Sequence, residues 1–269
     1  GSGTAARHAQ RPHHAAKPLY APAGRWYNIA MLEEMRRISL HPRLLAAAEL
    51  LGRQRVIADI GCDHGRLSCA LLQRDACDRC IAADVSAPSL EKAKKLSGFV
   101  GVANRIDLRC GDGLSVLQSG EADAVAMLGM GGTLMARLLD ACEQPLMGAR
   151  LLVLQPMRAE EDIRRYLYEH GYRVKEDRVV RDAGRLYQVF SALPPCDGTR
   201  DDWPEGFPTD CFQVGYRAFS KREPLLPILA KRKLEQCLLR LQTARGTEGE
   251  ARLAERAAQM QIILDHWED

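Results

Sequence analysis

Five short apolar segments follow one another in the first 156 residues of the chain, and stretches with helical spacing separate them. Strands that are apolar at nearly every position are typical of a parallel sheet covered by helices on both faces. The alternation therefore predicts an α/β fold. We expect strands at 56–61, 80–86, 105–112, 123–132 and 150–156, and helices at 65–74, 87–98, 132–142 and 160–170.

Two further segments with strand composition, 172–182 and 185–193, are separated only by a short Ala-Gly turn. Such a short turn joins antiparallel neighbours in a hairpin. We therefore expect a seven-stranded, mostly parallel sheet whose last strand is antiparallel. A dinucleotide-binding dehydrogenase would more often continue with parallel units.

The last part of the chain has the pattern of two helices, with a break at 246–249. We expect an apolar stripe of Leu234, Cys237, Leu238 and Leu241 to face one of Leu253, Ala257, Met260 and Ile263 in a helical hairpin. The parts expected are a disordered leader or tag at 1–30, an α/β domain at 31–195, a linker at 196–212 and a helical, coiled-coil-like domain at 213–269.

The turn after the first strand carries Gly61, Cys62, Asp63, His64 and Gly65. In open α/β sheets, ligands bind beyond the carboxyl ends of the strands, beside this turn. A dinucleotide-binding turn has a second glycine where this chain has Asp63. That carboxylate would repel a pyrophosphate at the helix start but is compatible with a sulfonium cation. The turn therefore favours S-adenosyl-L-methionine over NAD.

Two more carboxylates follow successive strands at the positions where this cofactor needs acceptors. Asp84 ends the second strand, where it would accept from ribose hydroxyls, and Asp112 ends the third strand, where it would accept from the adenine amino group. A helix cap or a turn is the alternative for each of them alone. The cofactor-binding residues expected are Asp59, Gly61, Cys62, Gly65, Asp84, Val85, Gly111, Asp112, Gly113 and Gly129.

The fourth strand ends in the sequence LGMGG. Three glycines in so few residues are a poor choice for stability, so we expect Gly129, Met130 and Gly131 to form a backbone wall against the methyl acceptor. Asp63 is the candidate catalytic carboxylate, with His64 orienting it or touching the base. The alternative is that Asp63 caps the following helix and His64 hydrogen-bonds within the turn.

With these motifs assembled, the chain resembles the bacterial tRNA (adenine(22)-N1)-methyltransferases of the TrmK type, which are class I methyltransferases. The resemblance lies in ADIGCDHGRL, RCGDGL, LGMGG, LLVLQP, GRLYQVF and Val214-Gly215, and it covers roughly residues 36 to 269. It departs from the family at Cys62, where Ser is usual, at Asp84, where Glu is frequent, and at Met157, where Asn is expected. The change at Met157 puts in doubt any polar contact of that residue with the target base.

The resemblance implies a Rossmann-like catalytic domain with a helical tail. It also implies methyl transfer from S-adenosyl-L-methionine to N1 of an adenine, A22 in the D-arm region of tRNA, with S-adenosyl-L-homocysteine as the product. Two alternatives stay open: a methyltransferase acting on another RNA, a protein or a small molecule, and a non-catalytic RNA-binding protein that has retained the fold.

The distribution of charge supports an RNA partner. Between Gly215 and Arg245 there are eight Lys or Arg residues against two acids, and such a surface can neutralise phosphates. A solvated helix face is the alternative for a charge run that stands alone. We expect a cytoplasmic protein that is a monomer or weak dimer and has no membrane-spanning segment. We also expect no metal, because Cys77 and Cys80 have no second pair of ligands at zinc spacing and are interpreted as two helix-end thiols.

Overall fold

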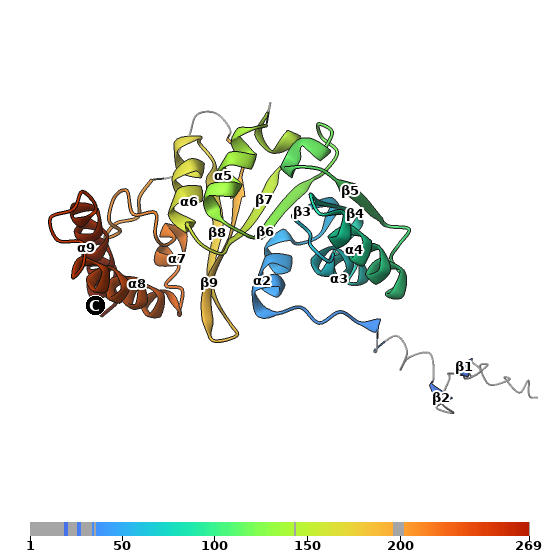
Figure 1. Cartoon of the computed structure of the whole chain (residues 1–269), viewed down its shortest axis with the longest axis horizontal. Coiled ribbons are helices and arrows are strands. Elements are labelled where there is room, and N and C mark those ends of the chain that lie inside the picture. The colour runs from blue at the N-terminus through green and yellow to red at the C-terminus, as the bar shows by residue number, and fades with distance from the viewer. Residues whose placement is uncertain are drawn as a thin grey trace, which may run out of the picture. The chain divides into compact units, whose positions relative to one another are not determined.

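The computed structural model describes residues 19–20, 26–27, 34, 36–142, 144–195 and 202–268 (Figure 1). The chain forms two compact units, 1–37 and 38–269. Within the first unit, β1 (Leu19–Tyr20) pairs with β2 (Trp26–Tyr27) in antiparallel orientation. Most of the expected leader and part of the expected linker lie outside the described residues, so the expected division of the chain stays a prediction.

The second unit contains a seven-stranded sheet with the order β5-β4-β3-β6-β7-β9-β8. The pairs from β5 to β7 are parallel, whereas β9 is antiparallel to both of its neighbours. The predicted α/β sheet and its final hairpin are confirmed. The strands are β3 (Gln54–Ile60), β4 (Cys77–Asp84), β5 (Ile106–Cys110), β6 (Ala124–Met130), β7 (Leu151–Pro156), β8 (Arg173–Asp182) and β9 (Arg185–Leu193).

The central strands are apolar at consecutive positions because each face of the sheet is buried. Val56 and Met127 belong to one hydrophobic cluster, while Ile57 and Ala126 belong to another. Helices pack against both faces: α2 (Pro42–Leu51), α3 (Arg66–Gln73), α4 (Ala87–Phe99), α5 (Gly132–Asp140) and α6 (Glu160–Glu169), with the short 3-10 turns η1 (Gly113–Val116) and η2 (Pro145–Gly148) between strands.

The C-terminal part consists of α7 (Tyr216–Ser220), α8 (Leu226–Leu241) and α9 (Gly249–Glu268). Helices α8 and α9 pack against each other, as Figure 1 shows at the C-terminal end. The buried residues Met260 and Ile263 of α9 lie in the same hydrophobic cluster as Phe190 of β9, so the tail shares the core of the sheet. No described helix is both long enough and apolar enough to cross a membrane.

Two local expectations are wrong. Leu238, placed in the stripe between α8 and α9, is 49% exposed, because the inner face of α8 runs through Leu229, Ala230 and Cys237. Cys77 and Cys80 are buried free thiols within β4 and do not lie at a helix end. Nothing in the spacing of two cysteines distinguishes a strand from a helix end.

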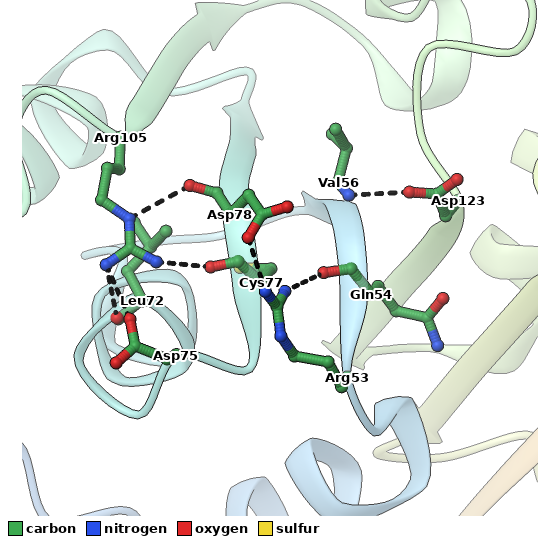
Figure 2. A network of polar contacts seen from close by, with 9 residues as sticks. All are labelled: Arg53, Gln54, Val56, Leu72, Asp75, Cys77, Asp78, Arg105 and Asp123. Atoms are coloured by element: carbon green, nitrogen blue, oxygen red, sulfur yellow. Dashed lines mark hydrogen bonds and ion pairs between the residues drawn. The ribbon is translucent and has the colours of Figure 1, made fainter.

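The amino edge of the sheet is held by a network of ion pairs and hydrogen bonds (Figure 2). Arg105 donates to the backbone carbonyls of Leu72, Cys77 and Asp78. Asp123 accepts from the backbone N–H of Val56 at 2.8 Å. These charged groups are occupied by contacts that tie the turns before β4 and β6 to the sheet. They are therefore structural, and ligand chemistry must be sought at the opposite edge.

Candidate active site

The carboxyl ends of β5, β4 and β3 lie side by side, so the turns that follow them are neighbours. Asp84, at the end of β4, joins all three turns. Its side chain accepts from the backbone N–H of Asp63 at 2.9 Å, and its carbonyl accepts from the N–H of Gly111 at 3.2 Å. The structure thus brings Asp63, Asp84 and Asp112 to adjoining positions at one edge of the sheet.

Asp84 keeps acceptor capacity for a ligand. Besides Asp63, its carboxylate accepts from the N–H of Ser86 at 2.8 Å, whereas a carboxylate offers about four acceptor positions. Val85 follows with its apolar side chain exposed, its whole residue 67% accessible. An acceptor for hydroxyls beside an exposed apolar side chain suits a nucleoside. Asp112 is also exposed and lines a pocket of about 390 Å³ together with Leu114 and Leu138.

Asp63 and His64 form the tip of the turn after β3. Asp63 has a positive φ of 49°, a conformation that Asp tolerates better than most residues. Its side chain is 70% exposed and contacts His64 Nε2 at 3.3 Å and Ser89 Oγ at 3.4 Å. Lys92 Nζ approaches the same His64 nitrogen at 3.1 Å. The tip therefore presents a carboxylate to solvent, with its immediate contacts coming from His64 and α4.

The capping alternative for Asp63 is not what the structure shows. Helix α3 begins at Arg66, its N-cap is Gly65, and no side chain caps it. Its first N–H groups therefore keep their capacity to bind a carboxylate or another anion, and the helix dipole favours negative charge at this end.

The glycine-rich turn after β6 touches the first turn. A Cβ on Gly61 would lie 2.7 Å from Met130 Cε, so Met130 packs directly on the backbone of the Gly61 turn. Gly129 has a φ of +76° at a register shift between β6 and β7. A Cβ on Gly129 or Gly131 would lie 3.8 or 3.5 Å from the nearest non-adjacent residue, so both positions have space beside them. A Cβ on Gly132, by contrast, would lie only 2.0 Å from the Ala159 carbonyl oxygen. Gly132 is thus required for packing, whereas the space beside Gly129 and Gly131 is compatible with the predicted wall at 129–131.

Some of the expected cofactor residues support the turns from beneath. Cys62 is buried, and burial raises the pKa of its thiol. Gly65, Gly111 and Gly113 let neighbouring side chains approach, because a Cβ on them would lie 2.8 Å or less from Ala93, Val116 and Leu138 respectively. The structure does not bring the Asp59 side chain to the surface of the site. It is 3% exposed and accepts from Ser68 Oγ at 2.6 Å.

The buried Asp59 predicts a pH dependence of stability. Burial raises the pKa of its carboxyl from 3.8 to about 6. The folded chain then binds more protons than the unfolded chain between pH 4 and 6, so this group makes stability fall as pH rises through that window. The variant Asp59→Asn should lack this loss, on the order of 3 kcal/mol over about two pKa units. Urea unfolding from pH 4 to 7 measures the free energy of unfolding of the wild type and of Asp59→Asn. If this free energy changed with pH in the same way in both proteins, the prediction would be contradicted. The exposed Asp140→Asn is the control.

Sequence reasoning missed two polar side chains beside the glycine-rich wall. Gln155, at the end of β7, is fully buried and accepts from Arg43 of α2 at 2.8 Å. Gln155 lies within the LLVLQP motif, so its position was a usable signal. Arg43 had none, because a cation in the first turn of a surface helix is unremarkable without tertiary contacts. Among the described residues, no three His, Cys, Asp or Glu side chains gather to hold a metal ion.

Comparison with known proteins gives sequence relatives for this arrangement. The methyltransferase domain family matches residues 40–190. The tRNA (adenine(22)-N(1))-methyltransferase of Bacillus subtilis is 35% identical over 158 residues, which are 59% of this chain and 66% of that protein. A putative tRNA methyltransferase of Mycoplasma pneumoniae is 29% identical over 153 residues, 55% of this chain and 69% of that protein. The chain thus matches about two thirds of the length of these relatives.

Solved structures resemble the chain over a larger part. The Bacillus subtilis tRNA methyltransferase TrmK superposes with a TM-score of 0.75 at 27% identity, covering 85% of this chain and all of that one. A putative tRNA (m1A22) methyltransferase of Streptococcus pneumoniae, in complex with S-adenosyl-L-methionine, has a TM-score of 0.68 at 22% identity, covering 82% of this chain and 98% of that one. The second likeness shows a shared fold.

Proposed function

The chain belongs to the methyltransferase domain family, and from this premise we propose that it methylates N1 of an adenine in tRNA, A22 in the D-arm region. The methyl donor is S-adenosyl-L-methionine and the product is S-adenosyl-L-homocysteine. The observation that carries the proposal is the Asp63 turn, bonded to Asp84 and packed on Met130. In the proposal, the exposed Asp63 carboxylate would lie between the nucleoside-binding residues and the glycine-lined wall.

The residues present fit the proposed cofactor. Asp84 can accept from ribose hydroxyls, Val85 offers an apolar surface to a purine ring, and Asp112 lies on the next turn. The uncapped start of α3 suits the carboxylate of the methionine moiety. The bound cofactor supplies a methyl group on a sulfonium, and the negative potential of the three carboxylates favours that charge.

The protein's task in the reaction is positioning. Adenine N1 has an in-plane lone pair and is unprotonated at neutral pH, so attack needs no prior deprotonation. The lone pair forms the nitrogen–carbon bond as the carbon–sulfur bond breaks, which requires in-line alignment. The base must leave its stack to reach the site. The wall at 129–131 would hold the ring, and Asp63 would stabilise the positive charge that develops on it and accept a proton from its amino group.

A groove beside the wall fits the phosphate backbone of the substrate. The groove has a volume of about 330 Å³ and lies between the Met157 turn and the tail. Arg158 and Arg240 line it, and neither has an ion-pair partner among the described residues. Lys233 and Arg256, also in its lining, pair with Glu160 and Glu161. The two unpaired arginines are therefore the cations most available to phosphates.

Removing the free cations should weaken RNA binding without affecting the cofactor. Arg158→Ala and Arg240→Ala should each lower tRNA affinity severalfold. Each should also reduce the slope of log affinity against log salt concentration by about one, because one phosphate contact is lost. Filter binding at several salt concentrations measures both quantities. Arg53→Ala, which breaks a pair with Asp78 at the amino edge, is the matched control. An unchanged salt slope in both groove variants would argue against this docking surface.

The decisive experiment is incubation of the protein with an unmodified tRNA transcript and S-adenosyl-L-methionine, followed by mapping of the methylated base. We expect N1-methyladenine at position 22 and no product on a transcript with guanine there. Methylation elsewhere would favour another acceptor. Absence of cofactor binding in calorimetry would favour the non-catalytic alternative. A cytoplasmic monomer or weak dimer is part of the proposal, and analytical ultracentrifugation tests the oligomeric state.

A further inference from the structure

Arg43, in the first turn of α2, lies where four structural elements meet at the carboxyl edge of the sheet. Its Nη1 donates to Gln155 Oε1 at 2.8 Å, and its Nε lies 3.5 Å from Asp182 Oδ2 at the end of β8. Its guanidinium lies over the Tyr187 ring at 5.8 Å from the centroid. On the remaining side, a Cβ on Gly129 would lie 3.8 Å from Nη1. Arg43 thus adjoins the wall at 129–131.

The contact with Gln155 determines how the turn after β7 is held. Gln155 is fully buried, so its amide cannot exchange protein partners for bulk water. While Oε1 accepts from Arg43, Nε2 donates to the Pro156 carbonyl at 2.9 Å and to Met157 Sδ at 3.5 Å. Without Arg43, a buried acceptor would lose its partner, which favours rotation of the amide or entry of water.

The turn after β7 is also hydrogen-bonded to the wall at 129–131. The N–H of Met157 donates to the Met130 carbonyl at 2.9 Å, and the Met130 side chain packs on Gly61. A continuous series of contacts therefore runs from Arg43 through Gln155 and Met157 to Met130. It ends at the turn that carries Asp63.

We propose that Arg43 is a positioning residue for methyl transfer: by fixing Gln155, it sets the geometry of the acceptor wall at 129–131. This inference rests on the proposed function. A role limited to docking α2 would not single out Arg43, because Arg178 of β8 also forms an ion pair with α2, through Glu49. That second pair includes none of the residues in the series, so Arg178 provides a matched control that contacts the same helix from β8.

The test compares Arg43→Leu, Gln155→Leu and Arg178→Leu in single-turnover methylation of tRNA, with the cofactor Kd and the KM for tRNA measured in parallel. Arg43→Leu should lower the transfer rate at least tenfold, with both binding constants within about threefold of wild type. Gln155→Leu should give a similar loss. The double variant Arg43→Leu/Gln155→Leu should be no slower than the slower of these two single variants. Arg178→Leu should retain the wild-type rate. Arg43→Lys should recover part of the rate, because lysine provides a donor without the planar fork.

A second readout does not depend on the reaction. In protein labelled at its methionine methyl groups, Arg43→Leu should shift the NMR resonances of Met157 and Met130, and Arg178→Leu should leave them unchanged. Unmoved methionine signals, a rate within twofold of wild type, or an equal loss with Arg178→Leu would overturn the inference. If Arg43→Leu does not fold, Gln155→Leu decides by the same two readouts. A wild-type protein that does not methylate tRNA would instead count against the proposed function, while the NMR comparison would still test the role of Arg43.

Discussion

Asp63→Asn is expected to lower the rate of adenine methylation by about a hundredfold, with the affinity for S-adenosyl-L-methionine changed less than about threefold. Asparagine tolerates the positive φ at this position, so the turn should keep its shape. What it loses is the negative charge that would face the ring as positive charge develops there, and the capacity to accept a proton. The effect should therefore fall on the transition state and spare the ground state.

Single-turnover kinetics and calorimetry separate the two effects. Ser89→Ala is the matched variant, because Ser89 contacts the same carboxylate at 3.4 Å but carries no charge, and it should cost only a few-fold in rate. If Asp63→Asn weakened cofactor binding as much as it slowed transfer, Asp63 would belong to the cofactor site and the catalytic assignment would be wrong.

The largest expected loss of stability comes from breaking a buried ion pair between α6 and β8. Arg164 of α6 donates to both carboxylate oxygens of Asp177 in β8, at 2.6 and 3.0 Å, and to Gln188 Oε1 at 3.0 Å. Gly215 covers the carboxylate so closely that a Cβ there would lie 1.6 Å from it. Arg164→Met leaves Asp177 buried without its countercharge, and breaking such a pair costs about 3–5 kcal/mol.

Urea unfolding at neutral pH measures this loss. Lys221→Met is the matched control, because Lys221, at the C-cap of α7, forms an exposed ion pair with Glu176 of β8, and such pairs contribute about 1 kcal/mol or less. Replacing both Arg164 and Asp177 by apolar residues should cost less than Arg164→Met alone, since no charge is then stranded. Equal losses for Arg164→Met and Lys221→Met would contradict the expected cost of leaving the Asp177 charge buried without a partner.

Much of the fold could be read from local patterns. The apolar runs predicted the strands because a residue buried on either face of a parallel sheet must be apolar whichever way it points. The short turn between Asp182 and Arg185 predicted the hairpin, and the structure has β8 and β9 on either side of it. The resemblance to the tRNA (adenine(22)-N1)-methyltransferases is confirmed by the relatives and solved structures that match the chain.

Part of the candidate site could also be predicted from the sequence, and part could not. Asp63, Asp84 and Asp112 could be named from the sequence because each lies at or just beyond the carboxyl end of a predicted strand, and parallel strands bring these ends to one edge. The expected stripe of α8 failed at Leu238, because the rotation of a helix about its axis depends on what packs against it. Arg43, Gln155 and Asp182 come from three distant segments, and no local pattern links them.

The sequence by itself thus determined the α/β layout and the positions of three carboxylates at neighbouring strand ends, and it favoured a sulfonium nucleoside over a dinucleotide as the ligand. These follow from hydrophobic periodicity, glycine and charge, which act over a few residues. Only the tertiary structure decided that Asp63 does not cap α3, that the Asp59 side chain is buried and that Arg43 lies beside Gln155 and Gly129. Those outcomes depend on contacts between distant segments, and such contacts exist only once the sheet has assembled and excluded water.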